Sequence, residues 1–357
     1  MPINYIETDP QAKEYLMKAP KKEHRFTFAI IGYGPSFNMA PQHINAVTAN
    51  KGFELAGICD VSADRRAAAK SDYPDAKVFG SIGRMLSSVK PDLTIIITPH
   101  YLHAKQALQC MNAGSSVVVE KPMCVTTSEV KKMLATAKRK RVTLSTYHNR
   151  RWDRDFVVLR DLIQSNVIGD VFRIEAGQTG YSEQKTWWRA DKKISGGAIY
   201  DWGAHFTDWI LQLVPTKIDY VTGFQVKNPR WKKYTNEDHS ELTIRFKDNC
   251  LATLTISNLA MNETPRWRIL GSKGAIVDRG DKYEVTRNDK GENWTTFTPF
   301  DRVETDYPAY YKNVCDHIRD GVPLVITPES AGRVIGVLAA ANESAGKGSA
   351  PVKPVIQ

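Results

Sequence analysis

Hydrophobic and polar positions follow two different patterns along this chain of 357 residues. From residue 26 to about 147, short apolar runs alternate with segments of helical spacing. The apolar runs predict buried strands at 26–31, 54–59, 77–78, 93–98, 116–119 and 142–146. Helices are expected between them, at 43–50, 62–71, 82–88, 103–113 and 127–140. Strand, helix and strand repeated in this way predict a parallel sheet wrapped by helices, the doubly wound Rossmann arrangement.

After about residue 147 the alternation stops. A helix is predicted at 156–164 and a closing helix at 329–346, with strands at 171–177, 218–224, 241–246, 251–257 and 267–270. Turns such as Lys247-Asp248-Asn249 are too short to connect parallel strands. We therefore predict an N-terminal extension (1–25), a Rossmann domain (26–147) and a second domain (148–357). The last should be an α+β domain with an open, mostly antiparallel sheet.

Composition and charge narrow the class of protein. The chain has 49 basic and 39 acidic residues, a net charge of +10 that invites a polyanionic partner. The basic runs at 131–141 and 230–233 carry no nucleic-acid-binding motif, so they indicate solvated surface and no nucleic-acid partner. Five scattered cysteines without a C-x-x-C pair favour neither disulfides nor structural zinc. Neither a membrane helix nor a secretory signal is recognisable, and we expect a cytoplasmic protein.

Gly32-Tyr33-Gly34 follows the first apolar strand and precedes a helix. Glycines at such a turn let the backbone approach a pyrophosphate, which the helix N-terminus attracts. The third small residue of G-x-G-x-x-G is replaced by Phe37, although Ala40 could serve if residues 35–37 are an insertion. A plain tight turn is the alternative interpretation of this motif.

Asp60 strengthens the dinucleotide interpretation because it ends the second strand. A carboxylate there accepts hydrogen bonds from both ribose hydroxyls of an adenosine and repels a 2′-phosphate. NAD is therefore favoured over NADP, although Arg65 and Arg66 follow closely. These arginines are also compatible with a solvated helix face.

Two further motifs carry candidate catalytic groups. Lys121, in Glu120-Lys121-Pro122, follows a buried strand, where an ammonium can bind a reacting hydroxyl and stabilise oxyanion charge. Asp201 and His205 meet on one face if their segment is helical, and a carboxylate beside an imidazole makes a general base. The alternatives are a solvated lysine and a surface Asp–His pair. No cluster completes a metal site, and none is expected.

Aromatic and basic residues crowd the flanks of the Asp201 segment. They are Tyr147, His148, Arg151, Trp152, Trp187, Trp188 and Arg189. Flat rings beside polar groups suit a sugar, which offers apolar C–H faces and polar rims, while core packing is the alternative. His43, His100 and His103 are each expected to be structural rather than catalytic, although His100 follows a strand end and could face the cofactor.

The order and spacing of these motifs resemble the Gfo/Idh/MocA family of NAD(P)-dependent sugar and cyclitol oxidoreductases, from about Phe26 to Lys347. The matching features are Gly32, Gly34, Asp60, T-P-H-Y-L-H at 98–103, Ala113-Gly114, E-K-P at 120–122, Trp188-Arg189 and G-G-x-x-x-D-x-G-x-H at 196–205. The chain departs from the family in its longer glycine loop, in His100 where Asn is usual, and in residues 1–25. The first two departures bear on how the cofactor is held.

The resemblance implies the site residues. Catalytic roles are implied for Lys121, Asp201 and His205. Cofactor contacts are implied for Gly32, Gly34, Ser36, Phe37, Asp60, Thr98, Pro99, His100, His103, Glu120 and Lys121. Substrate contacts are implied for Lys121, His148, Arg151, Trp188, Arg189, Asp201 and His205.

The resemblance also implies the reaction. A hydride passes between a sugar, glycoside or cyclitol hydroxyl and the nicotinamide of NAD, with His205 as acid and base. Alternatives are a glycosidase or lyase that retains NAD and oxidises the sugar transiently, and a non-catalytic sugar or nucleotide sensor. The resemblance further implies that 26–147 is the dinucleotide-binding domain and 148–357 the substrate-binding and oligomerisation domain, with a homodimer or homotetramer that pairs through the C-terminal sheet.

Overall fold

The computed structural model describes residues 25–34, 39–184 and 187–357, which form two compact units. Of the described residues, the first unit takes in those up to Cys124, then Ser128–His148 and Tyr307–Ala331. The second holds Val125–Thr127, Asn149–Asp306 and Gly332–Gln357. The chain therefore returns to the first unit late, with helix α9 (Pro308–Asp320).

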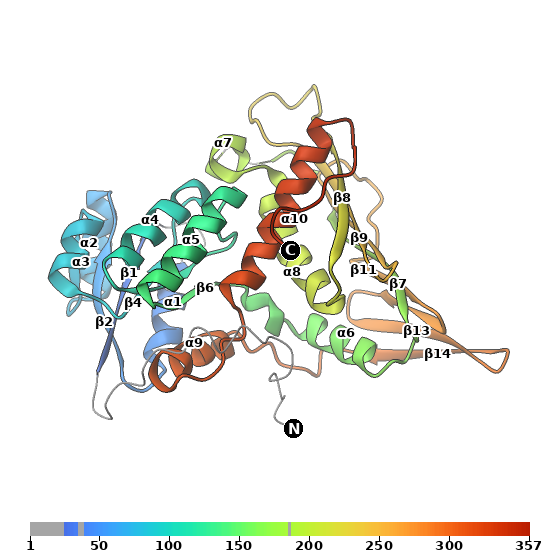
Figure 1. Ribbon diagram of the computed structural model, residues 1–357, viewed down its shortest axis with the longest axis horizontal. Helices are drawn as coiled ribbons and strands as arrows, with labels where there is room; N and C mark the ends of the chain where they lie inside the picture. The colour runs from blue at the N-terminus through green and yellow to red at the C-terminus, as the bar shows by residue number, and fades with distance from the viewer. Residues whose placement is uncertain (1–24, 35–38, 185–186) are drawn as a thin grey trace. The chain divides into compact units, whose positions relative to one another are not determined.

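A parallel sheet of six strands forms the centre of the first unit, as predicted (Figure 1). Its strands are β1 (Phe26–Ile31), β2 (Phe53–Cys59), β3 (Lys77–Phe79), β4 (Leu93–Ile96), β5 (Ser116–Val119) and β6 (Leu144–Thr146). They lie in the order β3-β2-β1-β4-β5-β6, and every neighbouring pair is parallel. This is the Rossmann order, in which the direction of winding reverses between β1 and β4.

Helices connect these strands, which parallel pairing requires. They are α1 (Met39–Thr48), α2 (Ala63–Asp72), α3 (Ile82–Val89), α4 (His100–Asn112) and α5 (Thr127–Lys140). Every residue of β4 and β5 is buried, which explains why these runs are rich in β-branched residues. Helix α4 begins at His100 rather than at His103 as predicted, because Pro99 already occupies its N-cap.

An open sheet of eight strands forms the centre of the second unit (Figure 1). The strands are β7 (Val171–Thr179), β8 (Ile218–Val226), β9 (His239–Phe246), β10 (Leu251–Ser257), β11 (Trp267–Gly271), β12 (Gly274–Asp278), β13 (Lys282–Asp289) and β14 (Glu292–Pro299). Their order is β14-β13-β12-β11-β7-β10-β9-β8. Only the β7–β10 pair is parallel, so the prediction of a mostly antiparallel sheet is confirmed.

Strands β12, β13 and β14 were not predicted from the sequence. Strand β14 is exposed along nearly its whole length, so it lacks the alternation of buried and exposed residues by which strands are recognised. It is held by its ladder with β13, from Lys282 opposite Pro299 to Asp289 opposite Glu292.

Helix α8 (Trp202–Leu213) packs its aromatic side chains against this sheet. The rings of Phe206 and Trp209 lie 5.4 and 5.9 Å from the ring of Trp267 on β11. The remaining helices of the second unit include α6 (Arg154–Gln164) and the short α7 (Lys192–Ser195), and α10 (Pro328–Gly346) follows α9. In the described ranges, no helix is long and apolar enough to cross a membrane.

Candidate functional site

The turn after β1 requires glycine at its first position. Gly32 has φ of +99°, and a Cβ atom there would lie 2.2 Å from the carbonyl oxygen of Ile97. The backbone of Gly32 therefore lies against the end of β4, at the point where the winding of the sheet reverses. Among the described residues, no atom lies within 4 Å of a Cβ built on Gly34. Ser36 and Phe37 fall outside the described residues.

Asp60 lies beside this turn, directly after β2. Its Oδ2 atom accepts a hydrogen bond from the backbone N–H of Tyr33 at 2.7 Å, and Oδ1 accepts one from Ser62 at 2.8 Å. Each carboxylate oxygen can accept a second hydrogen bond, so the group is both fixed and able to bind a ribose hydroxyl. Arg66 donates to the carbonyl oxygens of Asp60 and Val61 at 3.0 and 2.9 Å.

The segment after β4 is tied to the segment after β5 by His103. One ring nitrogen, Nε2, lies 2.7 Å from the carbonyl oxygen of Thr98, and Nδ1 lies 2.8 Å from that of Pro122. Thr98 also donates its hydroxyl to Gln106 at 2.7 Å. His100, the first residue of α4, is buried. His103 therefore contacts two strand-end segments of the first unit; a neutral imidazole donates to one of the two carbonyl oxygens and only a protonated ring donates to both.

Glu120 turns its carboxylate toward α1 and toward its own neighbour. Oε1 lies 3.0 Å from Nε2 of His43, and Oε2 accepts a hydrogen bond from the backbone N–H of Lys121 at 3.0 Å. Burial alone would raise the pKa of Glu120. The hydrogen bond with His43 and the charge of Lys121 outweigh burial, and the pKa lies below its usual value. The carboxylate is therefore ionised at neutral pH, and the peptide bond from Lys121 to Pro122 is cis.

His43 continues this contact to α9. Its Nδ1 atom lies 2.5 Å from the hydroxyl oxygen of Tyr311. The sequence analysis treated His43 as structural and did not identify Tyr311, which is 268 residues away along the chain. No local pattern connects two residues at such a separation.

Asp201 lies at the N-cap of α8 rather than inside the helix. The prediction of two helical residues four apart was therefore wrong for Asp201, because the chain turns there with φ −81° and ψ −86° before the helix begins. The Nε atom of Arg189 lies 3.8 Å from Oδ1 of Asp201. The guanidinium of Arg189 also lies 4.6 and 4.5 Å from the ring centres of Trp187 and Trp188.

His205 lies in the first turn of α8 and is buried, with 5% of its surface exposed. Its ring centre lies 5.6 Å from that of Trp202. The turn before the helix is anchored by Glu237, whose carboxylate accepts the backbone N–H of Ala198 at 3.1 Å and pairs with Lys192. Glu237 was not predicted as a site residue, since nothing in its local pattern distinguishes it from other acidic residues.

Arg151 forms a buried ion pair with Asp208 of α8. Two hydrogen bonds of 2.8 and 2.6 Å join the guanidinium to the two carboxylate oxygens, and the side chains are 7% and 3% exposed. This bidentate geometry is strong and directional. It neutralises the Arg151 charge within the second unit. His148, in the first unit, is also buried.

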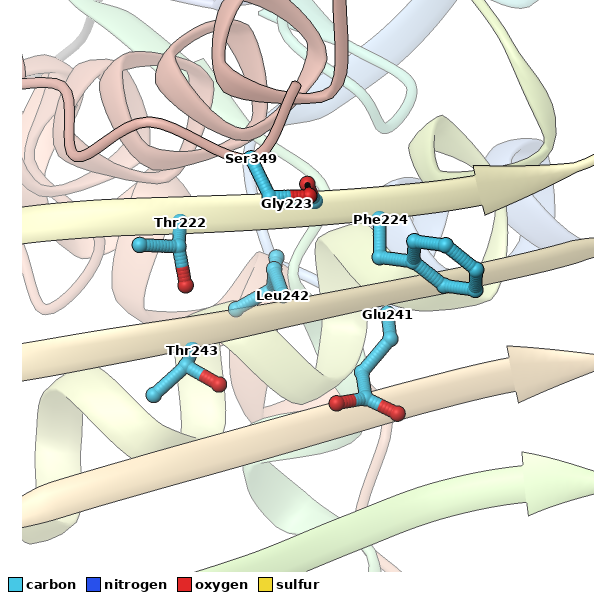
Figure 2. Close-up of a pocket in the computed structure, with 7 residues that line it drawn as sticks. All are labelled: Thr222, Gly223, Phe224, Glu241, Leu242, Thr243 and Ser349. Atoms are coloured by element: carbon cyan, nitrogen blue, oxygen red, sulfur yellow. Dashed lines mark hydrogen bonds between the residues drawn. The ribbon is translucent and has the colours of Figure 1, made fainter.

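A hollow on the second unit lies over strands β8 and β9 and the segment after α10. Figure 2 shows its lining, which consists of Thr222, Gly223, Phe224, Glu241, Leu242, Thr243 and Ser349. None of these is a predicted site residue. In the described part of the chain, no group of three or more His, Cys, Asp or Glu side chains could hold a metal ion.

The strand order, the glycine turn at the reversal point and the carboxylate after β2 define a dinucleotide-binding Rossmann unit. The family description "Oxidoreductase family, NAD-binding Rossmann fold" matches residues 26–148. The description "Oxidoreductase family, C-terminal alpha/beta domain" matches residues 160–353. The chain belongs to the Gfo/Idh/MocA oxidoreductase family, and the family supports a nicotinamide cofactor.

Similar proteins include two named inositol dehydrogenases. The scyllo-inositol 2-dehydrogenase (NADP(+)) IolW of Bacillus subtilis is 28% identical over 355 residues, covering 92% of this chain and 96% of that protein. The myo-inositol 2-dehydrogenase of Thermotoga maritima is 22% identical over 284 residues, covering 77% and 84%. The solved structure of the oxidoreductase yvaA from Bacillus subtilis has a TM-score of 0.82 at 25% identity, covering 94% and 99%.

Proposed function

We propose that this chain is an NAD-dependent dehydrogenase that transfers a hydride between a carbon bearing a hydroxyl, in a sugar, glycoside or cyclitol, and the nicotinamide. One observation carries the proposal: Gly32, Asp60 and Lys121 all follow carboxyl ends of strands in one parallel sheet. Ligands of such sheets bind outside these ends. The names of the two inositol dehydrogenases support the substrate class.

The cofactor would be held by the residues at this edge of the sheet. They are Gly32, Gly34, Asp60, Thr98, Pro99, His100, His103, Glu120 and Lys121, with Ser36 and Phe37 between the described ranges. The bare backbone at Gly32 and the fixed carboxylate of Asp60 fit a pyrophosphate and a ribose. When bound, the nicotinamide supplies the hydride acceptor or donor. The charge of Asp60 would repel a 2′-phosphate and so favours NAD, whereas IolW is named for NADP.

Three side chains would move and stabilise charge. His205 takes the proton of the substrate hydroxyl on an imidazole nitrogen and returns it in the reverse reaction. The Nζ atom of Lys121 donates a hydrogen bond to the same oxygen and favours its deprotonated form. Asp201, at the N-cap of α8, orients His205.

The substrate ring would contact the aromatic and basic side chains of the second unit. Trp188 offers a flat face for sugar C–H groups, and Arg189 lies between that ring and Asp201. The family resemblance adds His148 and Arg151 to the proposed substrate contacts. A direct role for Arg151 requires its guanidinium to hold Asp208 and a substrate oxygen at once, which its five N–H donors permit.

The test is a screen for NADH or NADPH formation with free sugars, inositols, glycosides and sugar acids. Lys121→Ala and His205→Ala should each lower kcat by about 100-fold or more, because each removes a group that acts on the reacting oxygen. Lys131→Ala, an exposed lysine of α5, serves as the matched control. NADH affinity, measured by fluorescence, should survive in His205→Ala and Lys131→Ala. Lys121→Ala should change NADH affinity much less than kcat, because Lys121 is one of many proposed cofactor contacts. Undiminished turnover in both active-site variants would contradict the assignment.

The same screen separates the alternatives. A glycosidase or lyase that retains NAD returns its hydride in each cycle, so it consumes glycosides without net NADH formation. A sensor binds the sugar and the dinucleotide but turns over neither.

We also infer that copies of the chain pair through the open face of the second unit's sheet, as the family resemblance suggests. Thr243, Thr253, Glu175 and Arg268 stand in one row across this face, and Glu175 accepts a hydrogen bond from Arg268 at 2.8 Å. Light scattering on the purified protein measures the number of copies.

A further inference from the structure

A chain of hydrogen bonds runs through the core of the first unit and ends at the candidate catalytic lysine. It starts at the hydroxyl of Tyr311 on α9, passes through both ring nitrogens of His43 on α1, and reaches the carboxylate of Glu120. The other carboxylate oxygen accepts the backbone N–H of Lys121 at 3.0 Å. His43 and Tyr311 are fully buried, and the Glu120 side chain is 14% exposed.

The protonation states in this chain of bonds are mutually consistent. Burial raises the pKa of Glu120, but the hydrogen bond with His43 and the charge of Lys121 lower it by more. The pKa therefore lies below its usual value, and the ionised carboxylate accepts hydrogen bonds. Burial raises the pKa of Tyr311 well above its usual value, and the negative charge of Glu120 adds to this effect, so the phenol keeps its proton. Because a carboxylate only accepts, the His43 tautomer with hydrogen on Nε2 donates to Glu120, and in that tautomer Nδ1 accepts the hydroxyl of Tyr311.

Burying these polar groups in the core costs free energy. A buried carboxylate and imidazole must be desolvated, and apolar side chains of similar volume avoid that penalty. The bonds specify, however, where Glu120 lies, and Glu120 acts on Lys121 both through the backbone hydrogen bond and through charge.

We propose that His43, supported by Tyr311, is a positioning residue that fixes Lys121 through Glu120. The inference rests on the proposed function, which places the Lys121 ammonium on the substrate oxygen. Hydride transfer is sensitive to such placement, since a displacement of about 1 Å of a reacting group can lower the rate about 100-fold.

The opposite end of the same segment is held independently. His103 lies between the carbonyl oxygens of Pro122 and Thr98, at 2.8 and 2.7 Å. One buried histidine thus contacts the segment at residue 120, and another contacts it at residue 122. Lys121 stands between these two points.

The test compares His43→Phe with His43→Gln. Phenylalanine keeps a ring but removes both hydrogen bonds, whereas the glutamine amide can donate to Glu120 and accept from Tyr311. We expect His43→Phe to lower kcat by about 10- to 100-fold, with KM and NADH affinity changed much less, and His43→Gln to regain most of the loss. His317→Phe is the matched control, because His317 is a buried histidine of the same unit that contacts the carbonyl oxygen of Val322 at 2.7 Å. Tyr311→Phe, which deletes one hydroxyl and keeps the packing, should give a smaller loss in the same direction.

A double-mutant cycle shows whether His43 acts through Lys121. In a Lys121→Ala background, His43→Phe should cause no further loss of kcat, because residues that act as a unit are not additive. An equal loss in both backgrounds would overturn the proposal and leave His43 a merely structural residue.

A second readout does not depend on turnover. Pyridoxal 5′-phosphate with borohydride labels lysine amines, and peptide mass spectrometry gives the ratio of label at Lys121 to label at Lys131. We expect His43→Phe to change this ratio by about fivefold, the effect of one lost hydrogen bond, and His43→Gln and His317→Phe to leave it unchanged. A ratio unaffected by His43→Phe overturns the inference. If the labelling ratio shifts while Lys121→Ala retains full turnover, the proposed function fails and the positioning of Lys121 stands.

Discussion

The ion pair between Arg151 and Asp208 supports a quantitative prediction about the second unit. Both side chains are nearly inaccessible, and two hydrogen bonds join them. Asp208→Asn removes the negative charge and leaves a buried guanidinium without its counter-charge. Breaking a buried pair in this way costs about 3–5 kcal/mol. For a domain of 150–250 residues, each kcal/mol lowers Tm by roughly 2–4 °C, so the expected loss is about 6–20 °C.

Tryptophan fluorescence during urea unfolding measures this loss selectively. All eight tryptophans lie between Trp152 and Trp294, within the second unit. Asp161→Asn is the control, because Asp161 pairs with Arg160 but its side chain is 60% exposed. Removal of such a pair should change the free energy of unfolding by at most about 1 kcal/mol.

A double variant separates lost charge from lost packing. Arg151→Met combined with Asp208→Leu should recover most of the stability, because well-packed apolar side chains replace buried ion pairs without desolvation. The reasoning is refuted if Asp208→Asn loses less than about 1 kcal/mol while KM for the substrate rises. That result would show Arg151 to be mainly a substrate contact.

Two further predictions concern the first unit. Gly32→Ala should abolish NADH binding and cost more stability than Gly52→Ala, since both glycines have positive φ but only Gly32 has a backbone oxygen within 4 Å of the added Cβ. Calorimetry and fluorescence titration measure both effects, and equal losses would contradict the close approach. Burial lowers the pKa of His317, and the hydrogen bond to Val322 offsets only part of this effect. His317 therefore binds a proton more readily in the unfolded chain than in the folded one. The contribution of His317 to the free energy of unfolding is fully present above about pH 6.5 and falls as the pH drops below that value. His317→Gln should therefore flatten the dependence of Tm on pH below about 6.5.

The Rossmann unit could be predicted from the sequence because its signals are local. Strands such as 93–96 and 116–119 are continuous apolar runs bounded by turn residues, and parallel strands buried on both faces must have that composition. The candidate cofactor residues follow directly after such runs. Finding a strand therefore also located Asp60 and Lys121.

Other features carry no local signal. Strand β14 is almost wholly exposed, so only its pairing with β13 makes it a strand. Asp201 stands in a segment with the spacing of a helix, yet the turn before α8 leaves it at the cap. Arg151 has the residue type of a substrate contact, and only the fold reveals that Asp208 neutralises it.

Propensity and burial pattern act over a few neighbouring positions. The alternation of strands and helices, the family resemblance and the motif residues could therefore all be predicted from the amino-acid sequence. Which distant side chains meet depends instead on the folded chain. Helix α9 returns to the first unit after the whole second sheet has formed and brings Tyr311 to His43. Contacts of this kind depend on how the chain closes over its core, and composition near either residue does not encode them.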